Sequence, residues 1–191
     1  MSRIRPLLTS LMLVALVAAP AFAAPGPQAQ DERKDLQIFK DVSNTVLRYT
    51  RFTIFDDVGA SIDQGVITLT GKVTMPFKRD DIENRVAKVP GVKRVINGIT
   101  VLPVSIYDDE LRYRIARAIY GNSAFWQYAT MTNPPIHVIV DRGQVTLTGV
   151  VNNEVERMLA RSLASGFGGF SITSELKTDA EVKAAMEKIG M

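Results

Sequence analysis

Histidine and cysteine, the residue types most often found in catalytic and metal sites, are almost absent from this chain. Of 191 residues one is histidine and none is cysteine, so the chain has no thiol nucleophile. His137 lies in the apolar segment 136–140, where alternation predicts a strand with His137 on the face opposite Val138. A metal site needs further ligands, and a catalytic triad needs a nucleophile and an orienting acid. The sequence offers neither at compatible spacing, so we interpret His137 as a strand residue on the open face of a sheet.

Three pairs of adjacent carboxylates are the next candidates for acid–base chemistry: Asp56-Asp57, Asp80-Asp81 and Asp108-Asp109. Neighbouring side chains diverge on helices and strands, so these pairs do not by themselves form a dyad. We interpret them as helix caps and solvated surface. The glycine-rich segment 166–169 follows a predicted helix, whereas a dinucleotide-binding turn follows a strand and opens a helix. The sequence therefore predicts no catalytic residues, no metal site and no cofactor.

One cluster has the composition of a membrane interface. Phe125, Trp126 and Tyr128 lie close together, and upstream are three arginines, Arg112, Arg114 and Arg117, of which the last two share a predicted helix face. Trp and Tyr favour the depth of lipid headgroups, and each cation near an anionic surface gains about 1 kcal/mol. Arg114, Arg117, Phe125, Trp126 and Tyr128 are therefore the candidate lipid-binding residues. The alternative is that Trp126 packs beneath its loop or between two domains.

An eleven-residue phrase that occurs twice indicates how these residues are positioned. Residues 63–73 read DQGVITLTGKV and residues 141–151 read DRGQVTLTGVV, an offset of 78 positions with seven of eleven identical. Duplication on this scale indicates one fold formed twice in succession. In each copy a turn containing Gly65 or Gly143 joins two alternating segments, which predicts a β-hairpin. A tandem of small modules disfavours a single deep catalytic cleft.

Helices and a third strand complete each copy. Apolar and small residues at three- and four-residue spacing predict a first helix with one common face: Leu36, Phe39, Ser43, Val46 and Leu47. We expect helix, strand, strand, helix, strand in both modules. This is an α+β fold in which each three-stranded mixed sheet packs on two helices. The expected domains are residues 35–103 and 107–177, followed by a short C-terminal helix at 178–191 that a capping box at 178–181 opens.

The same offset relates the second helices of the two modules. Leu159 and Leu163 stand where module one has Asp81 and Arg85. An apolar stripe on an otherwise solvated face marks a contact surface. These leucines therefore contact module one or the C-terminal helix, or they bind a protein partner or lipid.

The N-terminal segment has the pattern of a secretory signal peptide. Arg3 and Arg5 precede the apolar segment 7–19, and the small-x-small motif at 21–23 predicts cleavage after Ala23. The apolar segment is shorter than the roughly 20 residues that span a bilayer, so we expect no transmembrane segment in the mature chain. Residues 24–34 should form a flexible leader. The net charge of +3 includes Arg3 and Arg5, and no segment interleaves dense Lys/Arg with aromatics, which disfavours nucleic acid as a partner.

The repeated phrase resembles the BON-domain family of bacterial envelope proteins. The resemblance rests on the pattern G-x-[IV]-T-L-T-G-x-V at 65–73 and 143–151, and on Pro90-Gly91-Val92 followed by Val95-Ile96-Asn97. The second module departs from it at 166–170, which replaces the Pro-Gly-Val turn. The resemblance implies α+β modules in exported Gram-negative proteins, a role in envelope integrity or osmotic stress, phospholipid binding in some members, and no established catalytic residues.

We therefore expect a non-enzymatic periplasmic binding module that attaches peripherally to anionic envelope phospholipid. The alternative is a soluble, chaperone-like stress protein that binds envelope or unfolded proteins through Leu159 and Leu163.

Overall fold

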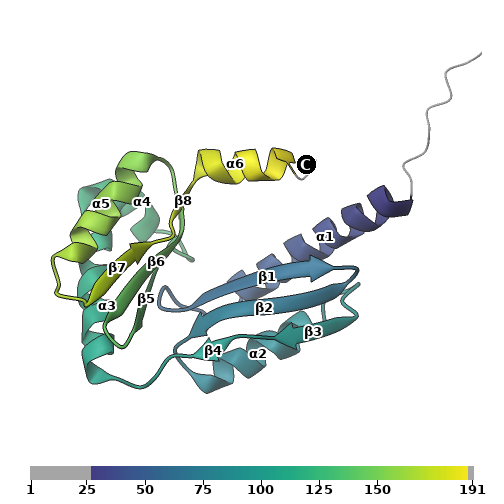
Figure 1. The fold of residues 1–191 in the computed structure, drawn as a ribbon, viewed down its shortest axis with the longest axis horizontal. Helices are drawn as coiled ribbons and strands as arrows, with labels where there is room; N and C mark the ends of the chain where they lie inside the picture. The colour runs from purple at the N-terminus through teal and green to yellow at the C-terminus, as the bar shows by residue number, and fades with distance from the viewer. Residues whose placement is uncertain (1–26, 189–191) are drawn as a thin grey trace, which may run out of the picture.

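The computed structural model describes residues 27–188 and contains two consecutive modules (Figure 1). Module one consists of α1 (Pro27–Leu47), β1 (Asp57–Asp63), β2 (Val66–Val73), α2 (Pro76–Val86), β3 (Arg94–Asn97) and β4 (Thr100–Val101). Module two consists of α3 (Ile106–Tyr120), the 3₁₀ helix η1 (Ser123–Phe125), α4 (Trp126–Ala129), β5 (Ile136–Asp141), β6 (Gln144–Val151), α5 (Glu154–Ser165), β7 (Ser171–Ser174) and β8 (Lys177–Thr178), and α6 (Asp179–Lys188) follows. The predicted α+β fold of two tandem modules is confirmed. The expected signal peptide, residues 1–23, lies outside the described residues.

The repeated phrase forms the same hairpin in both modules. β1 pairs antiparallel with β2, and β5 pairs antiparallel with β6. At the first turn Gln64 and Gly65 have φ of 48° and 80°, and at the second Arg142 and Gly143 have φ of 52° and 75°. Two successive left-handed residues give the hairpin turn whose twist matches that of the strands.

The third strand of module one is interrupted, so its sheet has four strands rather than the expected three. A continuous strand over 92–101 is expected, but β3 ends at Asn97 and β4 begins at Thr100, both parallel to β2. The Asn97 side-chain oxygen accepts a hydrogen bond from the amide of Ile99 at 3.1 Å. The amide of Gly98 donates to the carbonyl of Leu69 at 2.8 Å, and the chain resumes pairing two residues later. Module two has the same interruption between β7 and β8.

Each module has its own core, formed where two helices pack on the sheet. The largest buried side chains include Val42, Ile67, Leu69 and Ile82 in module one, and Ile115, Ile119, Phe125 and Leu147 in module two. The predicted face of α1 is wrong in part: Val46 is buried, but Phe39 and Leu47 are exposed. The core face runs through Val42 and Val46 at a spacing of four, which leaves Phe39 and Leu47 beside it.

The expected flexible leader also differs from the structure. Helix α1 begins at Pro27, so residues 27–34 are helical.

The loop between α1 and β1 docks module one on module two. We call residues 48–56 the docking segment. Its Ile54 carbonyl accepts a hydrogen bond from the amide of Val138 at 2.7 Å, and the Asp56 carbonyl lies 2.6 Å from the His137 Nδ1. The Phe55 ring meets the Tyr113 ring edge-on at 5.0 Å. These contacts add one strand-like hydrogen bond to the outer edge of β5.

Asp56 fixes the shape of the docking segment. Its carboxylate is fully buried and pairs with the buried Lys78 Nζ at 2.6 Å. It also accepts hydrogen bonds from the amides and hydroxyls of Thr53 and Thr74, at 2.7 to 2.9 Å. Burial alone raises the pKa of Asp56, but the bonds from Lys78, Thr74 and Thr53 outweigh it and hold the pKa below its ordinary value of 3.8.

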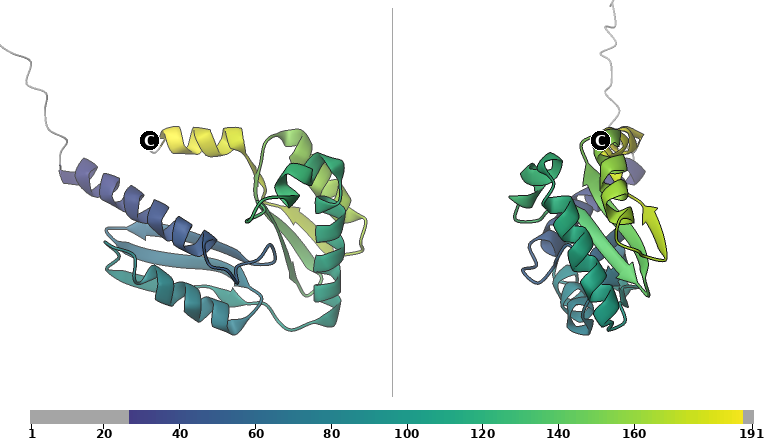
Figure 2. Two further views of the ribbon diagram at one scale, coloured as in Figure 1. Left: turned by 180° about the vertical axis from the view of Figure 1, so that it is seen from behind. Right: turned by 90° about the vertical axis from the view of Figure 1, so that its left-hand side faces the viewer.

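Helix α6 projects from module two (Figure 2). The amide of Thr178 donates to the Glu181 carboxylate at 2.7 Å, and the amide of Glu181 donates to the Thr178 hydroxyl at 3.2 Å. These are the two reciprocal bonds of the predicted capping box. Arg157 of α5 also pairs with Glu181 at 2.9 Å, which ties the first turn of α6 to module two.

Candidate functional site

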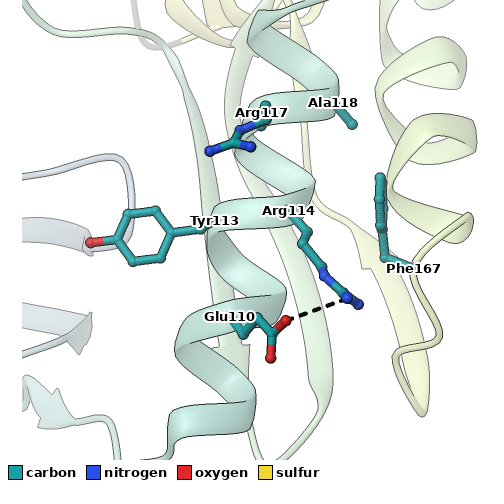
Figure 3. A pocket seen from close by; sticks show the side chains of 6 residues that line it. All are labelled: Glu110, Tyr113, Arg114, Arg117, Ala118 and Phe167. Carbon is teal, nitrogen blue, oxygen red and sulfur yellow. Dashed lines mark ion pairs between the residues drawn. The ribbon is translucent and has the colours of Figure 1, made fainter.

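Helix α3 presents the two candidate arginines to solvent. Its first turn is capped by Ser105, whose hydroxyl accepts from the amide of Asp108. Arg114 and Arg117 are both exposed, and Arg114 forms an (i, i+4) ion pair with Glu110 at 3.3 Å. They line an open cavity of about 470 Å³ between α3 and the loop that carries Phe167 (Figure 3). The cavity places two arginines and the carboxylate of Glu110 beside two aromatic rings, those of Tyr113 and Phe167.

Arg112 does not belong to this surface. Its guanidinium is buried, donates to the carbonyl of Val140 at 2.6 Å and pairs with Asp109. The sequence groups the three arginines, but only Arg114 and Arg117 are accessible to an external anion.

Phe125 and Tyr128 differ from the expectation that they face a membrane. Both are buried in the core of module two, with ring centroids 6.1 Å apart. The Tyr128 hydroxyl donates to the Glu156 carboxylate at 2.6 Å and accepts from the amide of Asn152 at 3.0 Å. Burial, and then the negative acceptor Glu156, raise the pKa of Tyr128 to about 12. These two aromatics anchor the segment between α3 and β5, residues 121–135, and cannot themselves contact lipid in this conformation.

Trp126 is the exposed member of the aromatic cluster. It begins α4, and 64% of its surface is accessible although its neighbour Phe125 is fully buried. Phe125 and Tyr128 therefore hold the short helix from below while the indole faces solvent. Arg117 lies in the last turn of α3, at the end from which η1 and α4 continue, so Arg117 and Trp126 belong to the same end of module two.

Leu159 and Leu163 are half-buried against the core of module two. They therefore do not form a free apolar surface. The exposed apolar residues of α5 are Val155 and Met158, which the sequence comparison missed. Their separation of three residues is a helical spacing and was the available signal. The offset of 78 pointed to Leu159 and Leu163 because charged residues replace them in module one. Sequence alone does not show which face of α5 the core covers.

His137, Asp56 and Asp108 hold parts of the fold together. His137 is half-buried at the junction of the modules, 5.5 Å from the Phe52 ring between centroids. Asp56 orders the docking segment, and the buried Asp108 accepts from the amides of Arg142 and Gly143 at 2.8 Å each. Within residues 27–188 no group of three or more His, Cys, Asp or Glu side chains could hold a metal ion.

Comparisons with known proteins bear on the fold and the family. A family model described as BON domain matches residues 35–103 and 108–180. Two solved structures of CdsD, a structural protein of the type III secretion system of Chlamydia trachomatis, are similar at low identity. One is 14% identical with a TM-score of 0.29 and covers 79% of this chain and 97% of that chain. The other, its C-terminal domain, is 13% identical with a TM-score of 0.32 and covers 87% and 71%.

Neither structural similarity is close enough to bear on function. A comparison with curated proteins gives no match. Among the described residues, no helix combines the length and hydrophobicity that crossing a bilayer requires.

Proposed function

The chain belongs to the BON-domain family, which is known for envelope or phospholipid binding without catalysis, and on this premise we propose that module two binds the surface of anionic envelope phospholipid. Trp126 enters the headgroup region, and Arg114 and Arg117 contact the phosphates. The protein acts in the periplasm as a peripheral, non-enzymatic module that supports envelope integrity under osmotic or envelope stress.

The observation that carries this proposal is the placement of Trp126. An exposed indole is costly in water unless something covers it, and indoles favour the membrane–water interface. Trp126 is held out by the buried Phe125 and Tyr128, so no ordering of the loop is needed on binding. The insertion occurs only in module two, since nine residues separate α1 from β1 and fifteen separate α3 from β5.

Electrostatics alone gives a weak attachment. Two arginines near an anionic surface contribute about 2 kcal/mol, and the pairing of Arg114 with Glu110 reduces the share of Arg114. Insertion of the Trp126 side chain adds about 1.5–3 kcal/mol if its apolar surface is removed from water. Binding should therefore need both parts and weaken with salt.

Vesicle cosedimentation of the purified protein tests this proposal. Wild type should bind vesicles of mixed anionic and zwitterionic phospholipid and lose binding as salt rises. Trp126→Ala should bind about tenfold or more weakly, and Arg114→Gln/Arg117→Gln about tenfold to thirtyfold more weakly at low salt.

Two matched controls separate a site from general stickiness. Phe77 is an exposed aromatic of α2, and Arg94 is an exposed arginine at the start of β3; both lie in module one. Phe77→Ala and Arg94→Gln should bind like wild type. Equal losses in the controls and in the site variants would reject a localised membrane site.

A further inference from the structure

The outer edge of β1 differs from the outer edge of β5, its counterpart in module two. The carbonyl of Leu69 accepts from the amide of Gly98, on the side of β2 away from β1. Since Leu69 is opposite Ala60, the backbone groups of Ala60 must point away from β2. By the same alternation Val58 and Ile62 also present their N–H and C=O groups outward. None of these groups has a hydrogen-bond partner in the part of the chain that the structure describes.

The equivalent groups of β5 are largely satisfied. Ile136 donates its amide to the Tyr120 hydroxyl at 3.1 Å and accepts from it at 2.5 Å. The amide of Val138 donates to Ile54 of the docking segment, and the carbonyl of Val140 accepts from Arg112. Module two therefore satisfies its edge strand with two side chains and with one carbonyl from the turn that contains Ile54.

Module one lacks counterparts of Arg112 and Tyr120, the two side chains that bond to the edge of β5. Asp35 and Asp108 accept from the amides of equivalent hairpin turns, which aligns α1 with α3 at an offset of 73. At this offset Phe39 replaces Arg112 and Leu47 replaces Tyr120. These apolar residues are 37% and 44% exposed, and neither can bond to backbone.

An apolar groove lies along this open edge. Its volume is about 340 Å³, and its walls include Phe39, Val46 and Leu47 from α1 and Val58 and Ala60 from β1. The groove ends at the junction of the modules, because His137 and Gly149 also line it. It is therefore continuous with the interface at which the docking segment already pairs with β5. Open backbone beside an apolar groove is the arrangement that an added strand recognises.

The charges of the edge decide between two occupants. In a two-fold pairing of β1 with a second copy, centred on Ala60, Asp57 would face Asp63 of the other copy, and this would occur twice. Like charges directly opposite each other destabilise a strand pair. The groove lining contains the carboxylate of Asp57 and no lysine or arginine.

We infer that the edge of β1 binds an extended peptide segment of another protein, with apolar side chains at alternate positions and a basic residue at its ends. The peptide adds a strand to the sheet of module one along an edge whose counterpart in module two accepts one backbone hydrogen-bond partner from the docking segment. Its backbone bonds to Val58, Ala60 and Ile62, and its apolar side chains contact Phe39 and Leu47. This binding requires no membrane and is independent of the function proposed above.

A labelled synthetic peptide, Lys-Val-Thr-Val-Thr-Val-Lys, is the probe, and fluorescence anisotropy with the purified protein measures binding. Wild type should bind it, and hydrogen exchange should slow at the amides of Val58, Ala60 and Ile62. The same peptide with aspartate at both ends, or with a central proline, should bind about tenfold more weakly.

Phe39→Arg/Leu47→Tyr transplants the closing residues of module two and should weaken binding about tenfold without lowering the melting temperature. Ala60→Pro removes one outward N–H and should have the same effect, since an edge strand tolerates proline there. If either variant fails to fold, the wild-type exchange pattern decides. The inference would be overturned if the wild-type protein did not bind the peptide, or if the peptide slowed hydrogen exchange at another strand. It would also be overturned if the wild-type protein without peptide formed a dimer in which β1 of one copy pairs with β1 of the other.

Discussion

Asp56→Ala should lower the free energy of unfolding by about 3–5 kcal/mol, the cost of breaking a buried ion pair and leaving one charge alone. The buried charge left without a partner ion would be Lys78, which donates to Asp56 and to the Thr74 hydroxyl. The change also removes the acceptor for four bonds from Thr53 and Thr74. Urea denaturation measures the loss. Asp57→Ala is the matched control, because Asp57 is half-buried and makes no side-chain hydrogen bond to any described residue.

The same variant should loosen the contact between modules. The docking segment carries the Ile54 and Asp56 carbonyls that meet Val138 and His137. Hydrogen exchange at the amide of Val138 should therefore accelerate more than exchange in the core of module two. Unchanged stability, or equal effects of Asp56→Ala and Asp57→Ala, would contradict the role assigned to Asp56.

The pH dependence has a defined sign. The pKa of Asp56 is lower in the folded protein than its ordinary value of 3.8, so its contribution is complete above that value. The contribution is lost as pH falls below 3.8 and through the folded-state pKa. Wild type should therefore lose stability more steeply than Asp56→Ala on acidification below about pH 4.

Gly149→Ala should destabilise the protein by at least about 3 kcal/mol, from the strain of a left-handed backbone together with overpacking. Gly149 has a φ of 113°, and an added Cβ would overlap the carbonyl of Pro135. The overlapped group is backbone, so the hairpin itself would have to shift. Gly71, its counterpart in module one, has a φ of 114° and the same conflict with the carbonyl of Asp57.

Gly168→Ala separates backbone strain from the steric overlap of an added Cβ. Gly168 has a φ of 76°, but nothing lies within 4 Å of an added Cβ. This variant should lose only about 1–2 kcal/mol from backbone strain. Thermal denaturation of Gly149→Ala, Gly71→Ala and Gly168→Ala measures all three, and equal losses would show that the close approach of strands is not the cause.

These glycines explain how much of the fold the repeated phrase predicts. In each copy Gly65 or Gly143 forms the hairpin turn, Leu69 or Leu147 enters the core, and Gly71 or Gly149 permits close strand approach. The turn and the core position are local requirements, which turn chemistry and alternation predicted. The close approach at Gly71 and Gly149 depends on the carbonyls of Asp57 and Pro135, 14 residues away, and was not predicted. The break between β3 and β4 recurs between β7 and β8, with Gly98 or Glu175 bonded to the carbonyl of Leu69 or Leu147, and no periodicity indicates it.

The candidate site was predictable only in part. Composition identified the aromatic cluster around Trp126. It did not indicate that Phe125 packs in the core of module two, or that the Tyr128 hydroxyl bonds to Glu156, 28 residues away in the chain. Burial of Arg112 depends likewise on the carbonyl of Val140, a partner on another element. Sequence spacing places residues on one face of a helix, but it does not say what covers that face.

The most direct measurement is the depth of Trp126 in a bilayer. The protein contains one tryptophan, so its fluorescence reports this position alone. Vesicles of anionic phospholipid brominated near the headgroup end of the acyl chain should quench Trp126 strongly, and those brominated near the chain terminus should quench it weakly. Zwitterionic vesicles should give little quenching. If the protein cosediments with anionic vesicles while no brominated lipid quenches Trp126, module two does not bind the membrane through this residue.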